Sequence, residues 1–311
     1  MFVVLAADPS VDRMIEVERL ERAGLHWASA GTMRPSGKGV HLARALASQR
    51  LKARVVVPAG GQEGDNLVSL LRAEDIEVIR VRTEATVRTN ISLVEPDATV
   101  TRVNEVGPRL TGGEVQVLAD ALVKHADDAE WAVLAGRTPR GMDAEVLAEL
   151  VARLTVAGVK VAVDTSGTAL VEAVKAGPAL VKVTLDELKS ATARQLTTFA
   201  DVVDAAQQLR SLGAGAVLAG FGAKGAVLIE DTGAWRVKVV TAKPVNPGAG
   251  DALLAGFLAA GAEGKQALAA GVVWAAATFS LPGTFMPWLG DLGVCEGEVD
   301  ESSEWEEAVR G

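Results

Sequence analysis

Short apolar segments that alternate with helical segments constrain the fold of this chain more than any other feature. They occupy residues 2–7, 53–58, 76–81, 131–135, 159–164, 180–183, 216–219 and 226–229 and are rich in Val, Ala, Leu and Ile. Unbroken apolar runs of this length are typical of strands buried on both faces, and their alternation with helices favours a parallel sheet. We therefore predict an α/β fold with a doubly wound, mostly parallel sheet flanked by helices.

Two segments depart from this alternation. Residues 13–34 lack helix signals, and residues 82–104 alternate apolar with polar side chains around a turn at 95–98, as antiparallel strands do. We expect both segments to leave the main sheet. Arg88 and Asn90 share one parity, so they point the same way and either bind phosphate and hydroxyl groups or form an ordinary solvated face.

Composition narrows the class of protein. The 311 residues suffice for one large domain spanning 1–311, with an acidic tail at about 296–311. The net charge of −9 argues against a nucleic-acid partner, and no apolar run reaches the roughly 18 residues of a membrane helix. A single cysteine, Cys295, excludes an internal disulfide, and the N-terminus lacks the basic region of a signal peptide. We expect a cytoplasmic protein.

The stretch Gly248-Ala249-Gly250-Asp251 precedes an apolar run that suits a buried helix. Free N–H groups and the helix dipole at such a junction favour an anion, and small residues let its oxygens approach closely. A carboxylate beside an anion is unfavourable unless it has a task, and accepting a proton from an attacking hydroxyl is one. The alternative is that Asp251 is a simple N-cap in a glycine-rich turn.

The glycine-rich stretches of the chain match neither of two known phosphate-binding motifs. Leu253 stands where a dinucleotide fingerprint needs glycine, and Gly39 follows Gly37-Lys38 where a Walker A motif needs Ser or Thr. Lys38 between two glycines suits a cation close to ligand oxygens, or an ordinary surface turn. Asp12, just past the first strand, is either a ligand contact or a turn residue.

Further polar residues follow the predicted strands. They lie at Gly136-Arg137, at 164–167 (DTSG) and at 220–225 (GFGAKG). Because open α/β sheets bind ligands at the carboxyl ends of their strands, we expect these three loops at one ligand edge.

These motifs, taken in order, resemble the ribokinase-like (PfkB) carbohydrate kinases, in particular the branch of 1-phosphofructokinase and tagatose-6-phosphate kinase. The resemblance spans residue 2 to about 287. Its most specific part is Gly248-Ala249-Gly250-Asp251 with Ala255-Gly256-Phe257. Supporting motifs are Asp12-Arg13, Gly37-Lys38-Gly39, Arg88-Thr89-Asn90, Asn104-Glu105 with Gly107-Pro108, 164–167 and 222–226.

The resemblance implies transfer of the ATP γ-phosphoryl group to a ketohexose phosphate, with fructose 1-phosphate as the first expected acceptor and tagatose 6-phosphate or fructose 6-phosphate as alternatives. Asp251 matches the catalytic base, and Gly248, Ala249 and Gly250 match the anion hole. The substrate positions it implies are Asp12, Gly37, Lys38, His41, Arg88, Asn90 and Arg137. The nucleotide positions are Lys182, Glu187, Gly220, Gly222 and Gly225, with Glu187 an indirect contact for Mg²⁺. The segments 13–34 and 82–104 match a β lid that often pairs into a homodimer.

The chain also departs from the family pattern. Asp8 and His41 replace asparagines, Ser36 replaces a glycine, Arg137 replaces a serine, and Thr184 replaces the asparagine before Glu187. One hypothesis is an active kinase with altered preference, in which Arg137 adds a cation for a phosphate and His41 replaces an amide donor. The other is a protein that binds sugar phosphate or nucleotide without turnover. Retention of Asp251 favours the kinase. A metal site at His41 is disfavoured because neither His26 nor His125 pairs with it at helical spacing.

Overall fold

The computed structural model describes residues 1–97, 99–238, 246, 248–279, 281 and 285–287, together with the backbone of residues 298–300. Its strands are β1 (Phe2–Ala6), β2 (Ser10–Val17), β3 (Ala28–Ser36), β4 (Ala53–Gly60), β5 (Glu77–Thr86), β6 (Arg88–Val94), β7 (Val100–Asn104), β8 (Trp131–Ala135), β9 (Lys160–Asp164), β10 (Leu180–Thr184), β11 (Ala216–Gly220), β12 (Ala226–Glu230), β13 (Gly233–Lys238) and β14 (Glu298–Asp300). Its α-helices are α1 (Lys38–Ser48), α2 (Gly61–Ala73), α3 (Gly112–Lys124), α4 (Ala144–Val156), α5 (Gly167–Lys175), α6 (Leu185–Thr192), α7 (Phe199–Leu212), α8 (Ala249–Ala259) and α9 (Gly264–Phe279).

The main sheet confirms the predicted fold class. In the described chain its order is β14-β13-β12-β11-β10-β9-β8-β1-β4-β5. All pairs from β5 to β11 are parallel, and β12, β13 and β14 add antiparallel pairs at one edge. The chain moves from β1 outward in both directions, which is the doubly wound arrangement.

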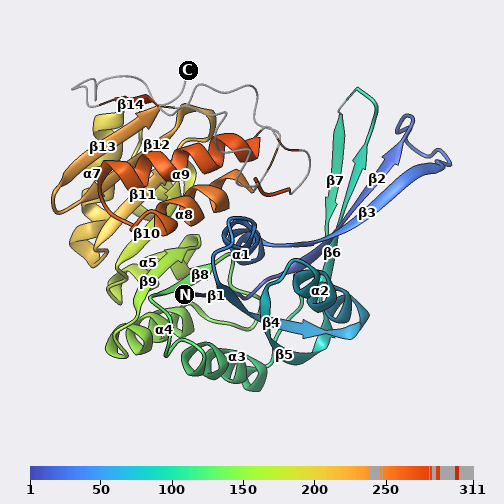
Figure 1. The fold of residues 1–311 in the computed structure, drawn as a ribbon, viewed down its shortest axis with the longest axis horizontal. Helices are drawn as coiled ribbons and strands as arrows, with labels where there is room; N and C mark the ends of the chain where they lie inside the picture. The colour runs from blue at the N-terminus through green and yellow to red at the C-terminus, as the bar shows by residue number, and fades with distance from the viewer. Residues whose placement is uncertain are drawn as a thin grey trace.

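Helices cover both faces of the main sheet (Figure 1). In β1, Val4 and Ala6 pack in a core with α1, α2, α8 and α9, whereas Val3 and Leu5 pack on the other face with α3 and α4. A third core joins β10, β11 and β12 to α5, α6 and α7. Burial on both faces explains why these strands read as unbroken apolar runs.

A second sheet of order β3-β2-β6-β7 projects from the main body at the upper right of Figure 1. We call these four strands the lid. β2 pairs antiparallel with β3 and parallel with β6, and β6 pairs antiparallel with β7. β3 leads into α1 through Gly37, whose φ of 111° lies in the region that favours glycine. The lid is therefore joined directly to the helix that begins at Lys38.

Several predicted boundaries differ from the structure. The first lid segment, predicted at 13–34, begins with β2 at Ser10 and ends with β3 at Ser36. β5 continues in the main sheet to Thr86, so the lid strands begin at Arg88 rather than near residue 82. Within the acidic tail predicted at about 296–311, residues 298–300 pair with β13. The rest of that tail lies outside the described residues. No helix in the described part of the chain is both long and apolar enough to cross a membrane.

Candidate active site

Asp251 lies in the first turn of α8, but it is not the N-cap. Gly248 occupies the N-cap position, and the helix has no side-chain capping bond. The carboxylate is 4% exposed and Oδ2 lies 3.0 Å from Nδ1 of His41. The simple N-cap interpretation is therefore wrong, and Asp251 is a buried carboxylate facing another titratable side chain.

The predicted anion site before Asp251 differs from expectation at one residue. The N–H of Gly248 donates to Oδ1 of Asn246 at 2.8 Å, and Nδ2 of Asn246 donates to the carbonyl of Phe285. The N–H of Gly248, one of the three predicted donors, is therefore already bonded to another group of the protein. Ala249 and Gly250 are the first residues of α8, so their N–H groups have no acceptor within the helix.

Two lysines and a carboxylate flank this helix start. Lys38 Nζ lies 2.7 Å from Oδ1 of Asp164, and Lys182 Nζ lies 2.8 Å from Oδ2. A Cβ added to Gly250 would lie 3.2 Å from Lys182 Nζ, so that ammonium group is next to the α8 loop. Burial alone would raise the pKa of Asp164, but Lys182 and Lys38 hold it below its ordinary value.

Glu187 completes this cluster. Its Oε1 accepts from Lys38 Nζ at 3.1 Å, and its Oε2 accepts from the N–H of Thr184 at 2.8 Å. The Thr184 hydroxyl in turn caps α6, so the two residues form a capping box. Burial opposes the charge of Lys38, but Asp164 and Glu187 raise its pKa above the ordinary lysine value.

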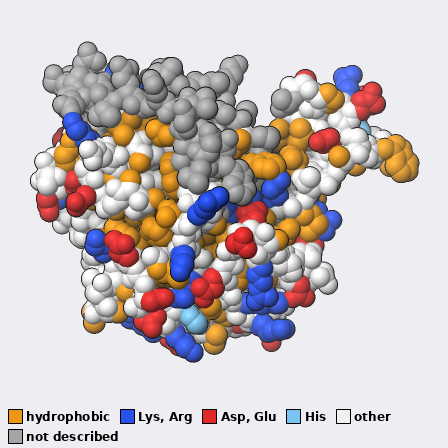
Figure 2. All heavy atoms as spheres, viewed as in Figure 1, with side chains coloured by type: hydrophobic (Ala, Val, Ile, Leu, Met, Phe, Trp, Pro, Cys, Tyr) orange, Lys and Arg blue, Asp and Glu red, His pale blue; other side chains and the backbone are white. Residues whose placement is uncertain are grey.

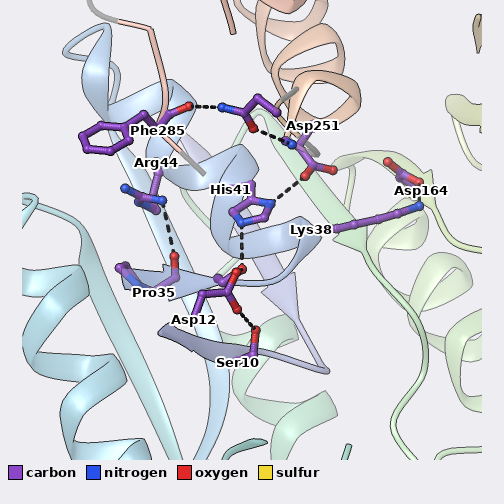
Figure 3. Close-up of polar contacts among 12 residues, drawn as sticks. Ser10, Asp12, Pro35, Lys38, His41, Arg44, Asp164, Asp251 and Phe285 are labelled. Atoms are coloured by element: carbon purple, nitrogen blue, oxygen red, sulfur yellow. Dashed lines mark hydrogen bonds and ion pairs between the residues drawn. The ribbon is translucent and has the colours of Figure 1, made fainter. Parts of the chain in front are cut away.

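His41 connects Asp251 to the lid, as Figure 3 shows. The ring is buried on α1, and its Nε2 lies 2.9 Å from the hydroxyl of Ser36 at the end of β3. That hydroxyl lies 2.7 Å from Oδ2 of Asp12 on β2. Both ring nitrogens are thus engaged by protein groups, which differs from the expectation that His41 directs a donor toward the sugar.

One face of the lid carries the polar residues. The register places Ser10 opposite Arg88, and Asp12 opposite Asn90. Nδ2 of Asn90 donates to Oδ1 of Asp12 at 2.8 Å, and Nη1 of Arg88 donates to Oδ1 of Asn90 at 2.7 Å. The prediction that Arg88 and Asn90 point the same way is confirmed.

Asp8 holds two arginines near this face. Its Oδ1 accepts from Nε of Arg88 at 3.1 Å, and its Oδ2 accepts from Nη2 of Arg137 at 3.3 Å. Arg88 is largely buried, whereas the side chain of Arg137 is 67% exposed. The loop that follows β8 therefore brings Arg137 close to the lid, as we expected for a loop at the ligand edge of the main sheet.

Two cavities meet at Asp251 and Lys38. The first, of about 290 Å³, is lined by Lys38, Lys182, Thr184, Glu187, Gly220, Gly222, Gly225, Asn246, Ala249, Gly250, Asp251, Leu253, Val272, Ala275 and Phe279. The second, of about 420 Å³, is lined by Ser10, Asp12, Ser36, Gly37, Lys38, His41, Arg88, Asn90, Ser92, Arg102, Asn104, Arg137 and Asp251. We call them the loop cavity and the lid cavity. Lys38 and Asp251 line both.

Nearly every residue predicted for the site lines one of these cavities; Gly248 lines neither. The predicted nucleotide residues surround the loop cavity and the predicted substrate residues surround the lid cavity. Sequence reasoning did not assign roles to Asp164, Asn246, Ser36 or Arg102. Asp164 had a usable signal as an acid at a strand end, and Asn246 had one as the asparagine of an Asn-Pro-Gly turn sequence, where the side chain can accept from the N–H two residues on.

This fold and site define a phosphate-handling α/β enzyme with a cavity at a helix N-terminus beside a polar lid. The sequence profile of the pfkB family carbohydrate kinases matches residues 7–288, and the chain belongs to this family.

Individual relatives agree with that assignment. The 1-phosphofructokinase of Haloferax volcanii is 31% identical over 306 residues, covering 96% of this chain and 98% of that one. The ATP-dependent 6-phosphofructokinase isozyme 2 of Escherichia coli is 30% identical over 80% and 82% of the two chains. The tetrameric inhibited form of phosphofructokinase-2 from Escherichia coli superposes with a TM-score of 0.86 at 29% identity, over 94% and 97%. The chain is a sugar-phosphate kinase of the 1-phosphofructokinase and phosphofructokinase-2 type.

Proposed function

We propose that this chain transfers the γ-phosphoryl group of ATP to a hydroxyl of fructose 1-phosphate, with Asp251 as the general base. The observation that carries the proposal is that Asp251 and Lys38 line both cavities. A nucleotide in the loop cavity and a sugar phosphate in the lid cavity would meet at these two side chains.

The proposed step needs a base at this junction. The acceptor hydroxyl forms a bond from its oxygen to the γ-phosphorus, the bond from that phosphorus to the β-phosphate oxygen breaks, and ADP leaves. The hydroxyl proton passes to the Asp251 carboxylate. Because His41 occupies Oδ2, the other carboxylate oxygen of Asp251 is the one assigned to the substrate.

Charge on the transferring group is proposed to be stabilised by groups of this chain. The N–H groups of Ala249 and Gly250 begin α8, and the Lys182 ammonium lies beside Gly250. Preorganised donors of this kind are worth about 3 to 4 kcal/mol each in acyl-transfer enzymes. The ammonium of Lys38 lies between the two cavities and suits the phosphoryl group in transit.

The loop cavity suits ATP in two further respects. Gly220, Gly222 and Gly225 expose backbone at the cavity wall, and Leu253, Val272 and Phe279 supply an apolar surface for an adenine ring. No three His, Cys, Asp or Glu side chains of the described residues cluster as a metal site on their own. This fits Mg²⁺ held mainly by phosphates, where it would neutralise developing charge. With Asp251 assigned to the hydroxyl, Glu187 is the remaining carboxylate of the wall that would hold it.

The lid cavity suits a phosphorylated sugar. Arg88, Arg102 and Arg137 line it and provide guanidinium groups for the acceptor's phosphate, while Asp12 and Asn90 provide partners for hydroxyls. Asp8 pairs with both Arg88 and Arg137, so the phosphate would replace Asp8 at the exposed Arg137. Fructose 6-phosphate is the second candidate acceptor, because the Escherichia coli relative named a 6-phosphofructokinase matches most of the chain.

The lid is also proposed to pair in a homodimer. Leu25 and Trp27, between β2 and β3, have 81% and 82% exposed side chains, and Val103 and Val106 are also exposed. Figure 2 shows hydrophobic side chains at the far end of the projecting arm. Large apolar side chains exposed at a projecting tip, such as Leu25 and Trp27, suit a protein interface.

The test is an ADP-release assay with Mg-ATP across fructose 1-phosphate, fructose 6-phosphate, tagatose 6-phosphate and the unphosphorylated sugars. We expect turnover on fructose 1-phosphate, and a loss of about 10² to 10⁴ in kcat for Asp251→Asn with ATP binding retained. Equal turnover by Asp251→Asn would exclude its role as base. No turnover on any sugar, with ATP still raising the melting temperature, would identify a binding protein instead.

A further inference from the structure

A line of four polar groups, three of them buried, runs from the proposed base to the lid. Asp251 Oδ2 lies 3.0 Å from His41 Nδ1, His41 Nε2 lies 2.9 Å from Ser36 Oγ, and Ser36 Oγ lies 2.7 Å from Asp12 Oδ2. His41, Ser36 and Asp251 are 6%, 3% and 4% exposed. The groups come from α8, α1, β3 and β2, so this line joins the base to both lid strands that precede α1 (Figure 3).

The number of hydrogens in this line is informative. Three contacts require three hydrogens. A serine hydroxyl supplies one and a neutral imidazole supplies one, whereas ionised carboxylates supply none. With Asp12 and Asp251 ionised and the His41 ring neutral, the four groups hold two hydrogens for these contacts. The three contacts therefore need one proton more. An unmade contact here would leave a buried polar pair facing lone pair to lone pair, which is costly.

The neighbours of the line indicate which group holds the additional proton. Ser10 and Asn90 donate to Asp12 Oδ1 at 3.0 and 2.8 Å, and the Ser36 hydroxyl donates to Oδ2, so both oxygens of Asp12 act as acceptors. The imidazole is left as the group that can donate on both sides.

The other charged groups around α1 do not reach the ring contacts. Arg44, one turn further along α1, donates to both carboxylate oxygens of Glu74. Arg34 on β3 lies over the ring of Phe285 at 3.5 Å. Lys182 and Asp164 pair with each other. The charges in direct line with His41 are therefore the two carboxylates.

We propose that His41 is doubly protonated in the folded protein and positions Asp251 for the reaction. Nδ1–H donates to Asp251, Nε2–H donates to Ser36, and the Ser36 hydroxyl donates to Asp12. Loss of one proton from the ring breaks one of the three contacts. If the Ser36 hydroxyl then turns to donate to the ring, Asp12 loses the donor Ser36. The hydrogen bonding of Asp12 in the lid cavity therefore changes together with that of the base.

The role in catalysis rests on the proposed function, but the proton count does not. It is tested by the ¹⁵N spectrum of the imidazole rings in the full-length protein without ligands. The chain has three histidines, and His41→Asn and His125→Asn assign the signals. At neutral pH we expect the His41 ring to show two protonated nitrogens, because each of its two ring contacts then has a donor.

Ser36→Ala gives the matched comparison. It removes the middle hydroxyl, so the line no longer requires the additional proton, and we expect the His41 ring to become neutral at the same pH. A neutral His41 ring in the wild-type protein would overturn the proposal. A doubly protonated ring that persists in Ser36→Ala would overturn the role of the serine.

The kinetic test is the pH dependence of kcat/KM for the sugar phosphate and for ATP. We expect kcat/KM for the sugar phosphate to fall about tenfold per pH unit above the ionisation of His41, with a smaller fall for ATP. His41→Asn places an amide nitrogen where Nδ1 lies and does not titrate, so it should lose this alkaline limb, whereas His125→Asn should keep it. If His41→Asn kept the alkaline fall in kcat/KM, the positioning role would be refuted, even if NMR showed a doubly protonated His41 ring in the wild-type protein. Absence of turnover in every variant would contradict the proposed function and leave the NMR result to decide the proton count.

Discussion

Lys38 Nζ lies 2.7 Å from Oδ1 of Asp164, although 126 residues separate them. Lys38 begins α1 directly after the lid, and Asp164 ends β9 in the middle of the main sheet. Asp164 is fully buried and accepts from a second ammonium group, that of Lys182. One carboxylate thus holds two cations at the place where the loop and lid cavities meet.

Asp164→Asn should lower the free energy of unfolding by about 3 to 5 kcal/mol, because it leaves the buried ammonium of Lys182 without its counter-ion. Urea unfolding followed by circular dichroism measures the change. Asp120→Asn is the matched control, since Asp120 pairs with Arg153 at the surface, where solvent screens the pair and its contribution to stability is small. Equal losses in the two variants would mean that the Asp164 cluster contributes no more than a surface pair.

The stabilisation by Asp164 should depend on pH with a defined sign. Its pKa in the folded protein lies below the ordinary aspartate value of about 3.9, so the unfolded chain binds the proton more readily. The stabilisation by Asp164 is present above about pH 3.9, and it is lost as the pH falls through the pKa of Asp164 in the folded protein. The stability difference between wild type and Asp164→Asn should therefore shrink only in acid. A difference that shrinks at neutral pH instead would contradict this assignment.

Arg88→Ala should raise KM for a phosphorylated sugar more than tenfold and change KM for the unphosphorylated sugar much less. The physical reason is that the guanidinium lines the lid cavity and is held there by Asp8 and Asn90. Steady-state kinetics on both acceptors measures the split. Arg13→Ala is the control, because Arg13 pairs with Glu63 and does not line the lid cavity. Equal effects on the two acceptors would remove Arg88 from phosphate binding.

Gly39→Ala should destabilise the protein by about 1 to 3 kcal/mol. A Cβ on Gly39 would lie 2.8 Å from Cβ of Ala6 and 2.9 Å from the carbonyl oxygen of Leu5, where α1 packs on β1. Gly113→Ala in the first turn of α3 meets nothing within 4 Å and should be neutral or stabilising, since alanine is the better helix former. Thermal unfolding compares them. Similar melting temperatures for the two variants would show that α1 shifts without cost.

Trp27→Glu should convert a homodimer to a monomer, because it places a charge on the exposed apolar tip of the lid. Sedimentation velocity over a range of protein concentrations measures the change. Val156→Glu on α4 is the matched control, since Val156 is 90% exposed but lies on the main body. A wild-type protein that is monomeric at all concentrations, or a dimer that survives Trp27→Glu, would exclude the lid tip as the interface.

Local pattern was sufficient for the fold class and for most of the site. The predicted strand at 131–135 has the observed bounds, because its unbroken apolar run reflects burial on both faces. Arg88 and Asn90 were placed on one face because side chains in a strand alternate with period two. Gly250 and Asp251 were placed at a helix start because small residues and an acid precede an apolar run.

The partners of these residues were decided by the tertiary structure. Nothing local in the sequence shows that Asp164 joins Lys38 to Lys182, or that His41 faces Asp251 across 210 residues. Each of these contacts joins side chains whose separation depends on how α1, α8 and β9 pack. The sequence by itself determined which elements form and which groups reach the ligand edge, because propensity and periodicity are local. The protonation and pairing of those groups depend on distances of about 3 Å between distant segments, and packing alone sets such distances.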